Sequence, residues 1–278
     1  MSLVVGIDAG GTKLAAAAVD PGQGTVIERL EIPTGRERGG AAVLSDCAAL
    51  ARELAQRHAV VAIGIGVPEL VSLDGQIESA DNWDWRDGDW RPVLASVAPV
   101  FVESDVRAAA LAEARLGAGM GRSSFLYVSI GTGVSQALVI DGSPWPGARG
   151  NAVVCGAPLV ETVAGGAALA AKAGKARAEE VLASPEYEPI IEDATSALAM
   201  ELARLVNALD PEAVVFGGGL GLVAGFRDRI VAKLRPSIYA ELTRGLEALP
   251  GALGADAGVI GAALVAERDM SRLRASGF

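Results

Sequence analysis

The chain has 278 residues, with 24 Lys and Arg against 34 Asp and Glu, so its formal net charge is 24 − 34 = −10 at pH 7. This acidic balance argues against a nucleic-acid-binding protein, because nucleic acids are bound by basic surfaces. Hydrophobic residues make up 51% of the chain, which is enough for a large core. The length predicts two lobes or one large domain.

Membrane insertion and secretion are both disfavoured by the sequence. The longest stretch without a charged residue, 123 to 140, is interrupted by serine, glycine and threonine, so it is no apolar helix of ~20 residues. We see no signal peptide at the beginning of the chain. Two cysteines, Cys47 and Cys155, are too few for a disulfide scaffold. We therefore expect a cytoplasmic protein with no membrane partner.

The first half of the chain predicts strands first and then alternating helices and strands. Short apolar runs bounded by glycine, proline or aspartate predict strands, and apolar residues at helical spacing predict helices. The expected elements are strands over Leu3–Ile7, Leu14–Val19 and Thr25–Ile32, a helix over 40–58, strands over Val60–Val67 and Val97–Val102, and a helix over Asp105–Leu116.

The second half repeats this pattern. Two strands again flank a glycine-containing turn, so that Thr12 matches Thr132 and Asp20 matches Asp141. The expected elements are strands over Phe125–Ile130 and Val134–Ile140, a helix over about 192–209, a strand over Ala213–Phe216, and helices over about 221–234 and 257–269. The duplicated hairpin-plus-helix unit predicts two α/β lobes with a central cleft.

Glycine-rich turns supply the candidate phosphate sites. In Asp8-Ala9-Gly10-Gly11-Thr12-Lys13, the glycines allow the backbone N–H groups to approach an anion, and Thr12 and Lys13 can bind a phosphate. A carboxylate repels phosphate, so we expect Asp8 to hold Mg²⁺ through water. The turn Gly131-Thr132-Gly133 and the cluster Gly217-Gly218-Gly219 support the phosphate interpretation, although a P-loop signature is absent.

Several motifs in a fixed order resemble the ROK family of sugar kinases and repressors. The segments that carry the resemblance are Asp8–Lys13, Gly64–Pro68, Asn82–Trp85, Glu103–Ala110, Gly131–Gly133, Gly147–Gly150, Asp210-Pro211 with Phe216–Gly219, and Asp256–Ala263. The resemblance spans nearly the whole chain. It implies an actin/hexokinase-like (ribonuclease H-like) α/β fold and ATP- and Mg²⁺-dependent phosphorylation of a sugar hydroxyl. It also places the lobes at 1–106 with about 262–278, and at 107–261.

The resemblance assigns roles to individual residues. Asp105 matches the catalytic aspartate of the family, and a carboxylate can take the proton of a sugar hydroxyl as it attacks the γ-phosphate. The same position also suits an ordinary helix N-cap, and one residue can serve both roles. The expected substrate-binding residues are Gly66, Asn82, Ser104, Asp105 and Glu161, and the expected partner is a small-molecule sugar or a cyclitol.

This sequence also departs from the family pattern. Ser104 replaces the usual Asn, and Val154 and Ala157 stand where the family has a sugar-contacting Glu and His. The family's Cys-rich zinc segment is missing, and Cys155 alone cannot build a four-ligand site, so we expect no zinc. The only histidine, His58, is expected to be a solvated residue at a helix end.

These departures leave alternatives open. Arg107, Arg149 or Asn151 could replace the lost sugar contacts, and Trp83 or Trp85 could line the acceptor site or simply anchor a loop. A catalytically weak or dead sugar-binding protein remains an alternative function. A ROK-type repressor lacking its DNA-binding domain is a second one, disfavoured by the acidic charge. Because the family is often dimeric, the resemblance also implies a homodimer.

Overall fold

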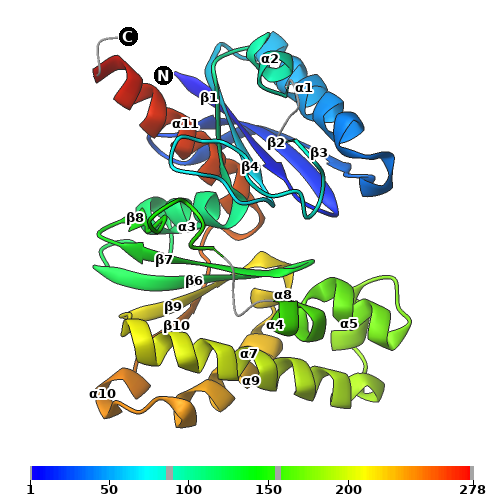
Figure 1. Cartoon of the computed structure of the whole chain (residues 1–278), viewed down its shortest axis with the longest axis vertical. Helices are drawn as coiled ribbons and strands as arrows, with labels where there is room; N and C mark the ends of the chain where they lie inside the picture. Colours follow the sequence, from blue (N-terminus) through cyan, green and yellow to red (C-terminus); the bar gives the residue numbers. More distant parts are fainter. Residues whose placement is uncertain (1, 86–89, 154–157, 276–278) are drawn as a thin grey trace. The chain divides into compact units, whose positions relative to one another are not determined.

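The computed structural model describes residues 2–85, 90–153 and 158–275. The chain divides into two compact units (Figure 1): unit 1 comprises Met1–Leu116, Pro146–Val153 and Asp256–Phe278, and unit 2 comprises Gly117–Trp145 and Val154–Ala255. Unit 1 therefore contains the whole of α3 (Asp105–Leu116) and of α11 (Ala257–Ala275). The lobe boundaries expected from the sequence, 106/107 and about 261/262, stay a prediction.

The sheet of unit 1 has five strands in the order β3-β2-β1-β4-β5. The strands are β1 (Leu3–Ala9), β2 (Lys13–Asp20), β3 (Thr25–Pro33), β4 (Val60–Val67) and β5 (Val100–Ser104). Strands β1, β2 and β3 form an antiparallel meander, whereas β1, β4 and β5 run parallel. The carboxyl ends of three neighbouring strands therefore meet at one edge of this sheet.

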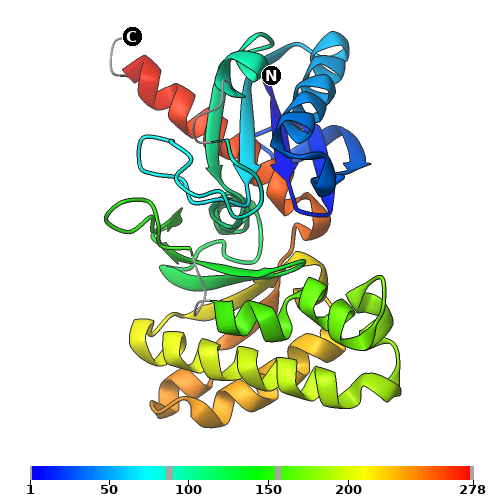
Figure 2. The same cartoon turned by 45° about the vertical axis from the view of Figure 1, so that its right-hand side comes forward.

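Helices α1 (Gly40–Arg57) and α11 cover opposite faces of this sheet, as Figure 2 also shows. Successive strand residues point to opposite faces. On one face, Ile7 and Ile65 share a core cluster with Leu54 of α1. On the other face, a Cβ at Gly6 would lie 1.9 Å from a carbonyl oxygen of α11, and a Cβ at Gly64 would lie 1.8 Å from another. These glycines allow α11 to pack directly on the backbone of β1 and β4.

Unit 2 repeats the arrangement of unit 1. Its sheet order is β10-β9-β6-β7-β8, and the strands are β6 (Ser124–Ile130), β7 (Val134–Ile140), β8 (Ser143–Pro144), β9 (Ala213–Gly217) and β10 (Glu247–Pro250). Here β6, β7 and β8 are antiparallel, and β6, β9 and β10 are parallel. Each unit thus extends a meander by two parallel strands, which confirms the duplicated α/β architecture.

The core of unit 2 lies between its sheet and its longest helices. Leu198 and Leu202 of α7 and Ile230 of α9 form one buried cluster with Val128 of β6 and Phe216 of β9. The helices are α4 (Pro158–Ala164), α5 (Gly166–Ala173), α6 (Ala178–Leu182), α7 (Glu188–Leu209), α8 (Gly218–Gly221), α9 (Ala224–Leu234) and α10 (Glu241–Arg244). A short helix of unit 1, α2, spans Trp90–Ala95.

Two of the expected elements differ in the structure. Strand β5 begins at Val100, not at Val97, because the N–H of Val97 donates to Leu94 O in a turn that ends α2, and Pro99 has no N–H for a ladder. The helix expected over about 221–234 is divided into α8 and α9, since Val223 between them is extended. The remaining expected strands and helices are present, with shifts of a few residues at their ends.

His58 is not the solvated residue that we expected. Its side chain is 20% exposed, and its Nε2 lies 2.7 Å from Oε2 of Glu28 on β3. Arg57 forms an ion pair with the same Glu28 carboxylate. The reason is the tertiary structure: the end of α1 lies beside β3, so that Glu28 on β3 contacts both Arg57 and His58. These hydrogen bonds hold the pKa of Glu28 below its usual value.

Cys47 is a structural residue of the first core. It is buried within the α1 cluster, and burial raises the pKa of its thiol to about 12. The thiol is therefore protonated at neutral pH and is a poor nucleophile. None of the described helices is both long and apolar enough to span a bilayer.

Candidate active site

The candidate catalytic residues of unit 1 lie where β1, β4 and β5 end. Asp8 on β1 pairs in register with Gly66 on β4, and Gly66 pairs with Glu103 on β5. Asp105 follows directly as the first residue of α3. A Cβ at Gly66 would lie only 3.3 Å from Asp105 Cα. The missing side chain at Gly66 therefore keeps open the space between the two strand ends that carry Asp8 and Asp105.

The environment of Asp105 suits a proton acceptor. Burial, the negative charge of Asp8 and, more weakly, that of Glu69 raise the pKa of Asp105 to about 7, against the opposing hydrogen bond from Val106 N–H. That N–H lies 2.6 Å from Asp105 Oδ1, so the carboxylate also caps the beginning of α3. The helix-cap and catalytic interpretations are thus compatible. A carboxylate with a pKa near neutrality can accept a proton and release it again under ordinary conditions.

Asp8 is a second carboxylate with a raised pKa. Burial is the main cause and Glu31 adds to it, while Arg29 opposes the shift, and the resulting pKa is about 6. The first turn of α11 approaches closely, since a Cβ at Gly258 would lie 2.3 Å from Asp8 Oδ2. The positive end of a helix dipole favours a negative charge at this place. Both Asp8 and Asp105 have raised pKa values at one sheet edge, and a cation bound there would stabilise their ionised forms.

The Gly10–Lys13 turn is held by a residue that the sequence analysis did not identify. Thr34 is buried, its Oγ1–H donates to Gly10 O at 2.6 Å, and its N–H donates to Thr12 O at 3.0 Å. Lys13 is 66% exposed and forms an ion pair with Glu31 at 2.9 Å. The turn is therefore fixed from the β3 side, and the Lys13 ammonium lies in solvent, where it can be redirected toward an anion.

Other expected substrate residues of unit 1 lie near this edge. Ser104, the last residue of β5, is buried, and its N–H donates to Glu103 Oε1. The Nδ2–H of Asn82 donates to Pro68 O at 2.9 Å. The Oδ1 of Asn82 lies 3.9 Å from the point that a Cβ on Gly11 would occupy. The structure thus brings Asn82 next to the turn that begins after Asp8.

The phosphate turn of unit 2, Gly131–Gly133, rests on the beginning of α5. The N–H of Gly166 donates to Gly131 O at 2.8 Å, and the N–H of Ala167 donates to Thr132 O at 3.0 Å. The Oε2 of Glu161 accepts the N–H of Val134 at 3.0 Å. Glu161 therefore lies beside this turn, and within the described residues its second oxygen accepts no hydrogen bond. Its expected contact with the sugar stays a prediction.

The third glycine cluster lies at the same edge of that sheet. Gly217 on β9 pairs in register with Ser129 on β6, just before the Gly131–Gly133 turn. Gly218 has a φ of 74°, and a Cβ there would lie 2.4 Å from Ile130 O, so only glycine fits. At Gly131 and at Gly219 an added Cβ would meet nothing within 4 Å. Two glycine-rich backbone segments of unit 2 are therefore close together and open.

Three residues considered as sugar contacts have other roles in the structure. Arg107 is buried, pairs with Glu103 at 2.5 Å and donates to Val71 O and to Gly150 O, so it cannot serve as a replacement sugar donor. Trp83 and Trp85 are both buried in the α1 core cluster, which supports the interpretation as loop anchors. Val154 and Ala157 lie outside the described residues.

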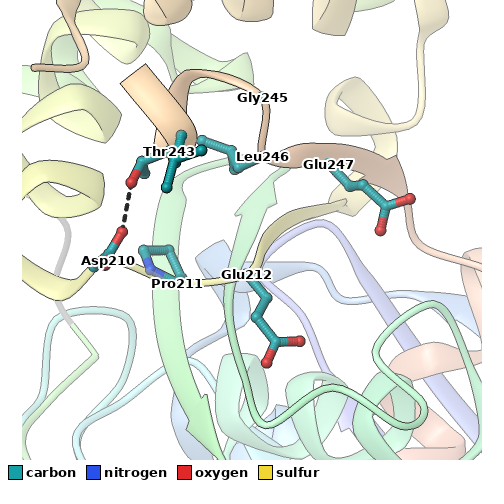
Figure 3. A pocket seen from close by; sticks show the side chains of 8 residues that line it. Asp210, Pro211, Glu212, Thr243, Gly245, Leu246 and Glu247 are labelled. Atoms are coloured by element: carbon teal, nitrogen blue, oxygen red, sulfur yellow. Dashed lines mark hydrogen bonds between the residues drawn. The ribbon is translucent and has the colours of Figure 1, made fainter. Parts of the chain in front are cut away.

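The pocket in Figure 3 is separate from the glycine turns of unit 2. It has a volume of about 350 Å³ and lies at the amino ends of β9 and β10, the opposite sheet edge. Thr243 donates to Asp210 Oδ1 across it at 2.7 Å. The lining of a second pocket of about 380 Å³ includes Ile191 of α7, Val223, and Phe226 of α9. No expected site residue lines either pocket.

Comparisons with known proteins agree with this architecture. The model of the ROK family matches residues 4–269. A glucokinase of Halalkalibacterium halodurans is 29% identical, over 92% of this chain and 92% of that protein. A bifunctional NanE/NanK enzyme of Brucella melitensis is 33% identical over 94% of this chain, which spans only 53% of that enzyme.

A solved structure shares the fold. The ROK family glucokinase of Streptomyces griseus, in complex with glucose and AMPPNP, aligns with a TM-score of 0.84 at 25% identity, covering 96% of this chain and 100% of that one. The ROK hexokinase of Thermus thermophilus aligns with a TM-score of 0.74 at 32% identity, covering 97% and 99%. With a family model that matches nearly its whole length, this chain belongs to the ROK family.

Proposed function

We propose that this protein is a carbohydrate kinase that transfers the γ-phosphate of ATP to a hydroxyl of a sugar or sugar-like polyol, with Asp105 as the general base. The observation that carries the proposal is the placement of Asp105 at the same sheet edge as Asp8 and its glycine-rich turn, with only β4 between their strands, and the raised pKa of Asp105 agrees with it. The relatives support it, since they include proteins named glucokinase and N-acetylmannosamine kinase.

In this reaction the hydroxyl oxygen of the acceptor attacks the γ-phosphorus. A new O–P bond forms, the bond from the γ-phosphorus to the bridging oxygen of ADP breaks, and the hydroxyl proton passes to the Asp105 carboxylate. Asp105 also orients the hydroxyl before attack. Its place at the beginning of α3, fixed by the Val106 N–H, limits the directions in which the carboxylate can point.

The residues present fit a magnesium nucleotide. Asp8 shares its sheet edge with Asp105, and a cation near Asp8 would offset the mutual repulsion of the two carboxylates. We infer that Asp8 holds Mg²⁺ through water and that the backbone N–H groups of the turns Gly10–Lys13, Gly131–Gly133 and Gly217–Gly219 bind phosphate oxygens. The ion supplies charge neutralisation of the phosphates when bound.

An ADP-release assay with Mg-ATP tests the proposal. The acceptor panel contains glucose, mannose, N-acetylmannosamine and several cyclitols, with a no-acceptor control that measures ATP hydrolysis. We expect at least one acceptor to raise ADP release well above that control. If none does, while calorimetry detects binding of a panel member, the protein is a sugar-binding protein without catalysis and the proposal is wrong.

A further inference from the structure

Glu69 is a buried carboxylate whose only effect described so far is its weak contribution to the raised pKa of Asp105. It follows β4 by two residues and is only 3% exposed. Burying a carboxylate without partners is strongly unfavourable, so a glutamate at such a position must be compensated by hydrogen bonds or by cations. Among the described residues, no Lys, Arg or His forms an ion pair with it.

Four donors from one short segment compensate the charge of Glu69. Oε1 accepts the N–H of Asn82 at 2.7 Å and the N–H of Trp83 at 3.2 Å. Oε2 accepts the N–H of Asp81 at 2.9 Å and the Oγ–H of Ser79 at 2.5 Å. A carboxylate is the side chain that can accept all four, since an amide would present a donor to one pair of them. Residues 79–83 are therefore folded around Glu69.

This arrangement fixes Asn82 from two sides. Its backbone N–H is bound by Glu69, and its side-chain Nδ2–H donates to Pro68 O. Within the described part of the chain, Asn82 Oδ1 accepts no hydrogen bond, and it lies 3.9 Å from where a Cβ on Gly11 would be. An acceptor oxygen is thus held in one place beside the turn that follows Asp8.

We propose that Glu69 is a positioning residue for the acceptor: by binding the backbone N–H groups of residues 81–83 and the hydroxyl of Ser79, it holds the Asn82 amide in the orientation that binds a substrate hydroxyl. The inference rests on the proposed kinase function and adds a residue to its acceptor site. Glu69 itself does not touch the substrate, because its oxygens already accept four hydrogen bonds from the protein. Small displacements of a binding group have large kinetic effects, ~100-fold for an error of about 1 Å.

The first experiment measures the loop without using activity. Hydrogen exchange of the amides of residues 81–83 is compared between wild type, Glu69→Gln and the control Glu78→Gln. Glu78 directly precedes this segment, is exposed, and its side chain accepts only a 3.3 Å hydrogen bond from Asn151 within the described residues. We expect at least tenfold faster exchange of one or more of these amides in Glu69→Gln and no change in Glu78→Gln. Unchanged exchange in Glu69→Gln would overturn the inference.

The second experiment measures kinetics with the best acceptor of the wild-type enzyme. We expect Glu69→Gln to raise the KM of the acceptor about 10- to 100-fold, with a smaller change in kcat and a KM for ATP within about twofold of wild type. An equal rise in both KM values would indicate general loss of structure and would contradict a positioning role. If Glu69→Gln does not fold, Ser79→Ala, which removes one of the four donors, should give a smaller shift in the same direction.

A double-mutant cycle identifies the residue through which Glu69 acts. In an Asn82→Ala background, Glu69→Gln should change the acceptor KM by less than about twofold, because the group that it positions is already gone. If instead the effects of the two substitutions on the acceptor KM multiply in the double variant, Glu69 does not act through Asn82. If the wild type phosphorylates no acceptor, the proposed function itself fails and the acceptor role of Glu69 falls with it, whereas the exchange result still reports on residues 79–83.

Discussion

Asp105 has two roles that place different demands on one carboxylate. As the first residue of α3 it accepts the Val106 N–H, which favours the ionised form. Burial and the nearby Asp8 favour the neutral form and raise the pKa to about 7. A general base needs this second influence, because a carboxylate of ordinary pKa holds a proton too weakly to remove one from a hydroxyl efficiently.

Replacing Asp105 by Asn tests the base directly. The amide keeps the size of the side chain and can still accept the Val106 N–H through its oxygen, so the fold should be retained. Loss of a general base should lower kcat by ~10²- to 10⁴-fold. Steady-state kinetics together with a melting curve check this, and a variant that keeps more than about half of the wild-type kcat would contradict the assignment.

The raised pKa of Asp105 predicts a dependence on pH. Below about pH 7 the carboxylate of the free enzyme becomes protonated and cannot accept the hydroxyl proton, so kcat/KM should fall up to tenfold per pH unit. Above that pH the base is ionised, and kcat/KM should reach a plateau. The rate is measured from about pH 5.5 to 8.5 with coupling enzymes in excess. A flat profile across this range would show that no group with a raised pKa takes part.

How well single residues could be predicted depended on whether their partners were close in sequence. Asp8 and Asp105 were identified because each belongs to a local motif that follows an expected strand, whereas their proximity became clear only from the parallel pairing of β1, β4 and β5. Thr34 and Glu69 gave no such signal, because Thr34 binds backbone groups of residues 10 and 12, Glu69 binds those of residues 81–83, and only the fold brings these groups near. Arg107 was wrongly considered a sugar donor for the same reason: its partners, Gly150 and Val71, are distant in sequence.

Helix α11 packs so closely on the first sheet that glycine is required at the points of contact. Gly6 and Gly64 meet carbonyl oxygens of α11, and Gly261 of α11 itself meets Ala108 O of α3, each at about 2 Å from a hypothetical Cβ. Such distances leave no room for a methyl group. The packing of α11, whose first turn lies next to Asp8, thus depends on glycine in β1, in β4 and in α11 itself.

We expect Gly64→Ala to destabilise the protein strongly. Its new methyl group would lie 1.8 Å from Ala262 O, so α11 would have to move away from β4. The cost should reach at least about 3 kcal/mol, the upper part of the range for overpacking. Gly225→Ala is the control, since an added Cβ there meets nothing within 4 Å. Urea unfolding of both variants checks this, and equal midpoints would refute the packing argument.

The elements that the sequence predicted well are those with a strong local pattern. β4, β7 and α3 have the expected bounds, because each is an uninterrupted apolar or amphipathic run. Short helices such as α4 and α6 and the four-residue edge strand β10 were missed. Segments this short contain too few residues to show a period, and only contacts with the rest of unit 2 stabilise them.

The protein as a whole should contain no structural zinc. Such sites need four ligands, most of them Cys or His. Cys47 is buried in the α1 core with its pKa raised to about 12, and the only histidine pairs with Glu28. Only Cys155, which lies outside the described residues, would remain. Elemental analysis of the purified protein should find far less than one zinc per chain, and stoichiometric zinc whose removal lowers the melting temperature would contradict this.

We expect glucose to be a poor substrate compared with the true one, because Ser104 is shorter than the usual Asn and neither Val154 nor Ala157 offers a polar side chain. A ring hydroxyl left unpaired costs ~1–3 kcal/mol. Two unpaired hydroxyls would therefore lower kcat/KM by roughly 30- to 10⁴-fold. Arg107 does not replace these lost hydrogen bonds, because its guanidinium pairs with Glu103 and donates to Val71 O and Gly150 O.

An acceptor whose hydroxyls match the remaining groups, Asn82 and Glu161, should therefore be preferred. Asn82 presents Oδ1 beside the Gly10–Lys13 turn, and Glu161 has one oxygen that accepts no hydrogen bond within the described residues. Both are hydrogen-bond acceptors, so each binds a substrate through a hydroxyl donor, and the positions of those hydroxyls on the ring decide which acceptor fits. Measuring kcat/KM for glucose, mannose, N-acetylmannosamine and several cyclitols decides the matter: the idea is wrong if glucose leads the panel at or above ~10⁴ M⁻¹s⁻¹.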